Sequence, residues 1–572
     1  MPSPIETSFA KSLFFGAILE PALFPFRRGR LPEDLVPTLE TWRRSLERLL
    51  PVGEPERPSR IETTLWEALG SIGALGISVP TTHGGGGWTV SAQARAYQEL
   101  VSIDTAIGCA ALAHGALACH ALATFGSSTA MEEHLPSLAS GKKTAAFALA
   151  EPTAGSDPAG LQTHAEKRNN NSYVINGTKG WTVLGEQSDV CIVFARTAPA
   201  DDGHKPRISG FVVPKGPGVT ATPTSPKLGV RGLPTSLLQL TQVAVPESAL
   251  LGEAGKGFLV ATDVLARARL SLAAGCIGLS KRIVRATLER ASGRRAFGRS
   301  IGEFGLIRNL LSRMLSDTFA LESTVYLSTG AVDAGLRDYA VESAICKILG
   351  AETVLRVAHL SMQVAAGLGY STEAPFERAL RDARFFSLFG GTNETLRCFV
   401  ALSGMQGPAK EIAEVGKAIR EPIKGFGLLS DFALRRARTV LGRDRMALHH
   451  PLLSREAAVL EDNVALLARN VDKVLRQHGQ EIAEMQFTQH RIANAAIDLY
   501  AIAAVISRTS HALHERGGDG ARRELDLTSV FVSDASSRLA RTMAAFDRND
   551  DELRKSIAAR ALSDGAYPLD IA

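Results

Sequence analysis

Four short stretches of the chain carry residue types that can bind a phosphorylated ring compound. The Gly/Ser/Thr-rich turn at residues 153–156 can offer backbone N–H groups and a hydroxyl to a diphosphate. The indole of Trp181 can cover a flat ring by stacking. Arg294 can pair with a phosphate, and Gln363 can hydrogen-bond to an adenosine or sugar-alcohol group. Taken singly, such residues are more often a turn, a core aromatic, a surface cation and a solvated amide.

A fifth stretch, residues 384–397 (RFFSLFGGTNETLR), places two glycines between an aromatic residue and a polar helix start. Gly390 offers a backbone N–H and no side chain. The next carboxylate along the stretch is Glu394, close to a helix start that Thr392 or Asn393 is expected to cap. Contact with a cofactor or with the positive end of that helix is the favoured interpretation of Glu394, rather than a role as a base.

In this order and at this spacing, these stretches resemble the signatures of the acyl-CoA dehydrogenase family, and in particular its very-long-chain type. The resemblance extends from about Ser8 to about Ala545 and includes a C-terminal extension. The matching stretches are residues 147–157 (FALAEPTAGSD), 176–181 (NGTKGW), 294–298 (RRAFG), 363–370 (QVAAGLGY), 377–382 (ERALRD), 489–492 (QHRI) and 498–501 (DLYA).

The resemblance implies an α+β fold that is mostly α: N-terminal helices, a central β-barrel or sandwich domain, a C-terminal four-helix bundle and an extra helical domain. It also implies an FAD-dependent enzyme. Such an enzyme removes a proton from the α-carbon of a fatty acyl-CoA and moves a hydride from the β-carbon to the flavin. Electrons then pass to an electron-transfer flavoprotein. The implied assembly is a homodimer, or a heteromer with a related subunit.

The chain departs from the family at the catalytic base. The family's glutamate, in a Phe/Tyr-Glu-Gly-Thr motif, corresponds to Gly390. Some members carry the base on an earlier helix, just before an arginine that corresponds to Arg269, and that position is Ala268. No catalytic residue is therefore identified. A thioester donor survives, because the family uses the backbone N–H of the base residue.

Substrate contacts are accordingly expected at Gly390, Gly391, Arg269 and Ser156. Restoring the side chain as Gly390→Glu is expected to return a base beside the α-carbon. Two other carboxylates are weaker candidates for that role. Glu151, in the first signature, is interpreted as structural, and Glu186 is expected on the flavin side, away from substrate.

The implied flavin contacts are also thinned. Ala150 and Val183 replace residues that carry a hydroxyl in the family, and Arg295-Ala296 stands where the wider family has a threonine. Ala366 replaces a glycine, and the Cβ that the alanine adds would crowd the cofactor. FAD binding is expected but weakened, because each lost hydroxyl contact costs about 0.5–1.5 kcal/mol. The expected cofactor contacts are Phe147, Leu149, Ala150, Gly155, Ser156, Trp181, Val183, Arg294, Phe297, Gln363, Gly367, Thr392 and Glu394.

Two functions stay open on the sequence. One is a flavin-dependent oxidoreductase acting on a long-chain fatty acyl-CoA, with an unidentified base or an altered reaction. The other is a catalytically inactive paralogue that binds acyl-CoA or serves as a partner subunit.

The bulk composition narrows the classes of function. Of 572 residues, 45% are hydrophobic and 22% are charged, as in an ordinary soluble protein. A net charge of +5 is too small to indicate a nucleic-acid partner. The six cysteines have no metal-ligand spacing, so no metal site is predicted and a reducing compartment is favoured. The start of the chain has no targeting pattern, which favours a cytoplasmic location.

One segment suggests contact with a membrane surface. Residues 419–440 (IREPIKGFGLLSDFALRRARTV) place apolar side chains beside Lys424, Arg435, Arg436 and Arg438. A basic amphipathic segment can lie on an anionic bilayer, and the very-long-chain enzymes attach to membranes through this region. A helix packed on its own domain is the alternative interpretation.

The elements that must position these residues follow from hydrophobic periodicity. Apolar residues recur at helical spacing in residues 35–50, 61–75 and 92–125. Helical spacing returns at residue 257 and includes 267–291 and 338–364. It resumes in residues 454–477, 486–515 and 526–545. Between about 144 and 251, short β-type runs predict strands near 172–175, 190–194, 208–213 and 236–245. The predicted domains are 1–143, 144–252, 253–404, a linker at 405–450, and 451–572.

Overall fold

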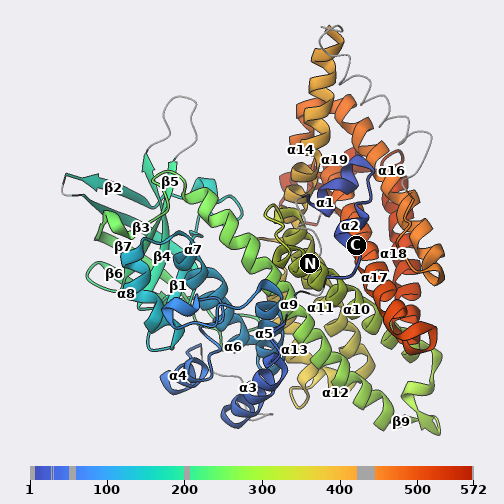
Figure 1. Cartoon of the computed structure of the whole chain (residues 1–572), viewed down its shortest axis with the longest axis horizontal. Coiled ribbons are helices and arrows are strands. Elements are labelled where there is room, and N and C mark those ends of the chain that lie inside the picture. The colour runs from blue at the N-terminus through green and yellow to red at the C-terminus, as the bar shows by residue number, and fades with distance from the viewer. Residues whose placement is uncertain are drawn as a thin grey trace. The chain divides into compact units, whose positions relative to one another are not determined.

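The computed structural model describes residues 7–27, 29, 31–50, 59–169, 171–198, 207–420, 445–567 and 569. The chain divides into two compact units, shown in Figure 1. The first contains Pro25–Leu396 with the chain start up to Ser8, and the second contains Phe9–Phe24 and Arg397–Ala572. The predicted domain boundaries did not anticipate that residues 9–24 group with the C-terminal helices.

The first unit begins with helices. They are α3 (Leu35–Leu49), α4 (Thr63–Ser71), α5 (Val90–Ile103), α6 (Thr105–Leu112), α7 (His120–Phe125) and α8 (Ser128–Ala139). The apolar stretch at 92–125 is not one helix, because Asp104 ends α5 and caps α6. Its carboxylate accepts the N–H groups of Ala106 and Ile107 at 2.9 and 3.0 Å. Residues Ala113–Cys119 then form a π-helix.

The middle of the chain forms one sheet of eight strands. Its strands are β1 (Ala145–Ala148), β2 (His164–Arg168), β3 (Ser172–Val183), β4 (Val190–Ala198), β5 (Arg207–Pro214), β6 (Val219–Pro223), β7 (Thr235–Pro246) and β8 (Leu250–Leu251). The order is β6-β7-β3-β2-β4-β5-β8, with β1 on β4. Pairing is antiparallel except for β1–β4 and β2–β4. Helices and strands are segregated, which confirms the predicted α+β class.

Four long helices complete the first unit. α9 (Gly257–Gly293), α10 (Gly305–Asp333), α11 (Ala340–Ala365) and α13 (Pro375–Phe386) pack on one another. A hairpin of β9 (Arg295–Ala296) and β10 (Arg299–Ser300) joins α9 to α10, and α12 (Gly367–Tyr370) follows α11. Residues 387–392 lead from α13 into α14 (Asn393–Arg420).

The second unit is helical. It contains α1 (Phe9–Ser12), α2 (Glu20–Leu23), α14 from Arg397 onward, α16 (Ser454–His478), α17 (Gln486–Gly520), α18 (Arg522–Ala544) and α19 (Asp551–Asp564). α14 continues through 405–420, where a linker was predicted. Gly404 and Gly407 lie inside this helix without breaking it. A Cβ on either would lie within 2.5 Å of the ring of Phe14 or Phe15, so only glycine fits at these positions. These glycines allow close packing.

Among the described residues, two helical stretches are long and apolar enough to cross a membrane, Thr105–Phe125 and Gln486–Gly520. The protein itself buries 89% of each apolar window. Burial of this extent is the pattern of core helices. The predicted membrane-surface segment, residues 419–440, lies outside the described residues from 421 onward.

Candidate active site

The loop that carries Gly390 is held by two cations from neighbouring helices. Arg269 of α9 donates from Nε to the Gly390 carbonyl at 3.1 Å. Lys347 of α11 donates from Nζ to the Gly391 carbonyl at 2.5 Å and to Asn393 Oδ1 at 3.0 Å. Thr392 then caps α14 by accepting the Thr395 N–H at 3.4 Å. The structure thus brings together the predicted residues Arg269, Gly390, Gly391 and Thr392.

Backbone geometry at this loop explains the two glycines. Gly390 has φ +74° and Gly391 has φ +102°, a region that side-chain-bearing residues rarely adopt. A Cβ built on Gly390 would lie 2.8 Å from Leu272 Cδ1. Leu272, on α9, is only 2% exposed. The place where a glutamate side chain would begin is therefore closed by a leucine methyl group.

This geometry corrects the expectation that Gly390→Glu alone returns a base. The substitution would require both a change of backbone conformation and a displacement of Leu272. At the second base position, Ala268 is 2% exposed and lies on α9, next to Arg269.

The two cations of the loop have unequal surroundings. Burial is the largest cause that lowers the pKa of Lys347, to about 7, while the carboxylates of Glu394 and Glu352 act to raise it. Burial lowers the pKa of Arg269 to about 10, and no acidic group contributes. In the part of the chain that the structure describes, no carboxylate lies within 4.0 Å of the Arg269 guanidinium.

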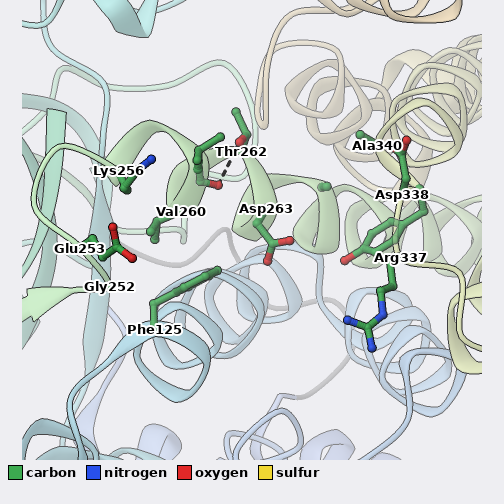
Figure 2. Close-up of a pocket in the computed structure, with 13 residues that line it drawn as sticks. Phe125, Gly252, Glu253, Lys256, Val260, Thr262, Asp263, Arg337, Asp338 and Ala340 are labelled. Carbon is green, nitrogen blue, oxygen red and sulfur yellow. Dashed lines mark hydrogen bonds between the residues drawn. The ribbon is translucent and has the colours of Figure 1, made fainter. Parts of the chain in front are cut away.

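A cavity of about 800 Å³ opens beside the same helix, two turns before Arg269 (Figure 2). It is lined by α9, by the end of α7 and by the segment that precedes α11. The lining residues are Phe125, Gly252, Glu253, Lys256, Leu259, Val260, Thr262, Asp263, Ala266, Arg337, Asp338, Tyr339 and Ala340. Burial raises the pKa of Asp263 and of Tyr339, so both sit in a partly desolvated wall.

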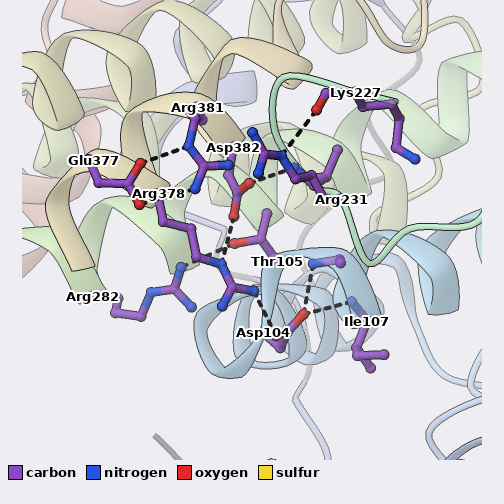
Figure 3. Close-up of polar contacts among 12 residues, drawn as sticks. Asp104, Thr105, Ile107, Lys227, Arg231, Arg282, Glu377, Arg378, Arg381 and Asp382 are labelled. Atoms are coloured by element: carbon purple, nitrogen blue, oxygen red, sulfur yellow. Dashed lines mark hydrogen bonds and ion pairs between the residues drawn. The ribbon is translucent and has the colours of Figure 1, made fainter. Parts of the chain in front are cut away.

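An ionic network fixes α13, the helix that leads into the Gly390 loop (Figure 3). Asp382 of α13 accepts the Val230 N–H at 2.5 Å, and its other oxygen lies 3.8 Å from Arg378 Nε. Arg378 also reaches Asp104 at 3.3 Å. The N-terminal helices, the strand region and the helical bundle are therefore joined through Arg378 and Asp382. Burial raises the pKa of Asp382 to about 6, against the effect of these hydrogen bonds and arginines.

The first signature forms a rigid turn beside β3. Glu151 is buried and accepts hydrogen bonds from Gln162 N, Thr163 N and Lys179 Nζ at 2.6, 3.0 and 2.8 Å. Burial acts to raise the pKa of Glu151, but these hydrogen bonds hold it below its usual value. Burial also lowers the pKa of Lys179, to about 8. Glu151 is thus committed to holding the turn, in agreement with its structural interpretation.

Trp181 stands next to this turn. Gly180 N donates to the Ala150 carbonyl at 2.9 Å, so β3 lies against the signature. Trp181 takes φ +54° and leaves 60% of its surface exposed. A large aromatic in a disfavoured backbone conformation, presented to solvent, is typical of a ligand-binding surface. Val183 and Thr182 are buried, and the Thr182 hydroxyl has no hydrogen-bond partner among the described residues.

The remaining predicted cofactor residues do not gather at this loop. Phe147, on β1, packs on Phe194 with ring centroids 5.2 Å apart. Arg294, Phe297, Gln363 and Gly367 are exposed, and no described contact joins them to Trp181 or Gly390. Ala366 takes φ +53° and ψ −132°, a conformation suited to glycine.

Three features of the site were missed from the sequence: Leu272, Lys347 and the lined cavity. Leu272 lies one turn after Arg269, so helical spacing alone places both on one side of α9. Lys347 interrupts the apolar run Ile345-Cys346-Lys347-Ile348-Leu349, and a lone lysine in such a run indicates a buried, partnered cation.

Family profiles match most of the chain. The acyl-CoA dehydrogenase N-terminal domain matches residues 38–142, the middle domain 146–243 and the C-terminal domain 255–404. The ACAD9/ACADV C-terminal domain matches residues 451–567.

Individual proteins are similar over most of their length. The human mitochondrial very long-chain specific acyl-CoA dehydrogenase is 34% identical over 95% of this chain and 85% of its own. The crystal structure of a Bacillus anthracis acyl-CoA dehydrogenase complexed with FAD has a TM-score of 0.74 at 25% identity, covering 99% of this chain and 94% of that one. The butyryl-CoA dehydrogenase of Megasphaera elsdenii has a TM-score of 0.62 at 29% identity, covering 66% and 99%.

Proposed function

We propose that this chain, which belongs to the acyl-CoA dehydrogenase family and within it to the very-long-chain type, binds a long-chain fatty acyl-CoA and FAD. It does not remove the α-proton of the bound acyl group at the rate of a dehydrogenase. One observation carries this proposal. Gly390 replaces the base, and Leu272 closes the space that a side chain at 390 would need. Loss of a positioned general base typically lowers the rate by about 10²–10⁴.

The loop geometry supports thioester binding. Because Arg269 and Lys347 fix the carbonyls of Gly390 and Gly391, the peptide groups of the loop are held in one orientation. The Gly390 N–H can then donate to a thioester carbonyl. Lys256 and Arg337, in the wall of the cavity, supply cations that suit the phosphates of a CoA moiety.

Binding of CoA esters tests this proposal. Isothermal titration with palmitoyl-CoA is expected to show saturable binding, and Arg337→Glu should weaken it at least about tenfold by placing a negative charge beside the phosphates. Arg285→Glu, an exposed position on α9, is the matched control and should leave affinity unchanged. Failure of the unaltered protein to bind palmitoyl-CoA would refute the proposal.

The residues present also fit FAD, though with fewer contacts than the family has. Bound FAD would supply the acceptor for a hydride. The exposed Trp181 offers a stacking face, and Gly155 and Ser156 offer exposed donors on the adjoining turn. Val183 and Ala150 contribute no hydroxyl. Titration is therefore expected to give measurable but weak FAD affinity, and an absence of binding at tens of micromolar would contradict this expectation.

A second candidate function is a working dehydrogenase that passes electrons to an electron-transfer flavoprotein. Lys347 favours it, because a buried amine whose pKa is about 7 is partly neutral at physiological pH and lies beside Gly391. Both of its described hydrogen bonds, however, are donated to the loop, which makes support of the loop its better-founded role. Flavin reduction that is lost in Lys347→Met but kept in Lys281→Met would favour this candidate.

The very-long-chain type also suggests contact with a membrane surface through residues 419–440. Replacing Arg435, Arg436 and Arg438 with glutamate should release the protein from anionic liposomes, because the attraction to the headgroups becomes repulsion. A parent protein that never co-sediments with such liposomes would end this hypothesis.

A further inference from the structure

A short segment, residues 228–234, connects the strand of Trp181 to the helix that leads into the Gly390 loop. At the end of the segment, the Pro234 carbonyl accepts the N–H of Leu184, which lies three residues after Trp181, at 2.9 Å. Strand β7 follows directly and pairs with β3. The segment is therefore tied to the part of β3 on which FAD is proposed to stack.

The start of the same segment is held on α13 at three points. The Asp382 carboxylate accepts the Val230 N–H at 2.5 Å, and Arg381 Nη1 donates to the Leu228 carbonyl at 3.0 Å. Between these two contacts, a Cβ on Gly229 would lie 2.2 Å from the Arg381 carbonyl oxygen. Only glycine fits there, so the backbone of the segment lies directly against the backbone of α13.

Val230 has a strained backbone. Its φ is +44°, which makes this β-branched residue an outlier, and its side chain is buried. The Leu233 N–H closes a turn on the Val230 carbonyl at 2.9 Å. Strain of this kind persists only where the surroundings hold it, and it gathers at functional sites. Because the described hydrogen bond of the Val230 N–H goes to Asp382, that carboxylate holds the strained turn.

Charged and titratable groups of several elements surround Asp382 (Figure 3). On α13, Arg378 Nε lies 3.8 Å from the carboxylate, while Glu377 and Arg381 pair with each other. The groups on other elements are Arg282 on α9, Asp104 between α5 and α6, Cys109 on α6, and Lys227 and Arg231 between β6 and β7. Burial raises the pKa of Asp382 to about 6 against the effect of the arginines, so this carboxylate changes charge at a higher pH than an ordinary aspartate.

We infer that Asp382 is a positioning residue, whose carboxylate holds Val230 and thereby fixes the distance between the strand of Trp181 and the Gly390 loop. The inference rests on the proposed function, because a thioester at the loop and a flavin on Trp181 must face each other. A protonated carboxyl group is the weaker acceptor for the Val230 N–H. Proton uptake by Asp382 therefore loosens the segment, and acyl-CoA affinity falls with it.

Acyl-CoA affinity at two pH values tests the inference. Isothermal titration with palmitoyl-CoA at about pH 5 and about pH 7.5 brackets the pKa of Asp382. The parent should bind at least about tenfold more weakly at the lower pH, because charge-assisted hydrogen bonds are roughly twice as strong as neutral ones. Asp382→Asn should bind at least about tenfold more weakly than the parent at the higher pH and show a smaller pH dependence. Lys347 and the CoA phosphates titrate in both proteins, so the difference between them belongs to Asp382.

A change at Val230 separates positioning from a merely structural role. Glycine takes a positive φ without being held, so Asp382→Asn combined with Val230→Gly should recover most of the parent affinity at the higher pH. Val230→Gly alone should bind like the parent at that pH but with a smaller pH dependence, which decides the question if Asp382→Asn does not fold. Glu289→Gln removes an exposed carboxylate on α9 and, as the matched control, should change neither the affinity nor its pH dependence.

Several results would overturn the inference. Equal palmitoyl-CoA affinity in the parent and in Asp382→Asn would do so while leaving the proposed function intact, and so would the same pH dependence in both proteins. A loss in Asp382→Asn that Val230→Gly does not restore would assign the effect to the arginines around Asp382 and would also overturn it. If the parent itself does not bind palmitoyl-CoA, the proposed function fails together with the inference.

Discussion

At the scale of single residues, two positions bear on the absent base, Gly390 and Leu272. Gly390 removes the carboxylate, and Leu272 occupies the space in which its side chain would begin. The same loop still keeps the Arg269 and Lys347 hydrogen bonds that orient its peptide groups. The loop thus has an ordered backbone, and position 390 carries no carboxylate.

Gly390→Glu is expected to lower the free energy of unfolding by about 1–3 kcal/mol, since it places a side chain at φ +74° against Leu272. It should not give rapid flavin reduction by itself. Gly390→Glu with Leu272→Ala should raise single-turnover flavin reduction at least about 10²-fold over the parent. Urea denaturation and anaerobic mixing measure the two effects, with Leu272→Ala as control. A fully stable Gly390→Glu single variant would contradict this account of the loop.

Ala366 is a second strained position. Its φ of +53° with ψ of −132° suits glycine, and a side chain there costs on the order of 1–3 kcal/mol. Ala366→Gly should therefore stabilise the protein by about 1 kcal/mol after the entropy of glycine is counted. Calorimetry should show a higher Tm, whereas Ala365→Gly, inside α11, should lower it. A lower Tm in Ala366→Gly would show that the strain is absent.

At the scale of elements, periodicity predicted most helices and four of the strands, because each buries one regular face. Within the eight-stranded sheet it missed β1, β2, β6 and β8, which are short, and it missed the break at Asp104, where a side chain caps the next helix. It also assigned Gly407 to a linker, although that glycine accommodates an aromatic ring. The ring contact comes from a distant part of the chain and leaves no local pattern.

The candidate site divides in the same way. Arg269, Gly390 and Gly391 could be predicted as site residues because each lies in or next to a short motif of the family. Leu272 and Lys347 reach the loop from two other helices, so their roles depend on how α9 and α11 pack. Sequence spacing cannot give that distance.

Lys347 links α11 to the loop and should make stability depend on pH. Burial lowers its folded pKa to about 7, while the unfolded side chain keeps a value near 10.5. Between these values the unfolded state binds more protons, so the free energy of unfolding should rise with pH from about 7 towards 10.5. Urea midpoints at neutral and alkaline pH measure this rise. It should be smaller in Lys347→Met and unchanged in Lys281→Met, and an identical pH profile in Lys347→Met would contradict it.

At the scale of the whole molecule, the exposed hairpin of β9 and β10 offers a test of the predicted dimer. Phe297, at the tip between β9 and β10, is 94% exposed, and Leu306 is 82% exposed. Phe297→Asp should weaken self-association at least about tenfold, because it places a charge in an apolar contact. Sedimentation velocity measures the effect. Leu562→Asp, 83% exposed on α19, is the matched control and should leave the dimer unchanged. A parent protein that is monomeric at micromolar concentration would refute this assembly.

We propose that this family member holds an acyl-CoA beside its flavin without beginning the reaction. The most direct test of this proposal is anaerobic rapid mixing of the FAD-loaded protein with palmitoyl-CoA while the oxidised flavin absorbance is followed. We expect a binding perturbation of the spectrum and no bleaching on the timescale of dehydrogenase turnover, because Gly390 and Ala268 supply no carboxylate. Rapid loss of the oxidised flavin band would contradict it and would require a base elsewhere in the site.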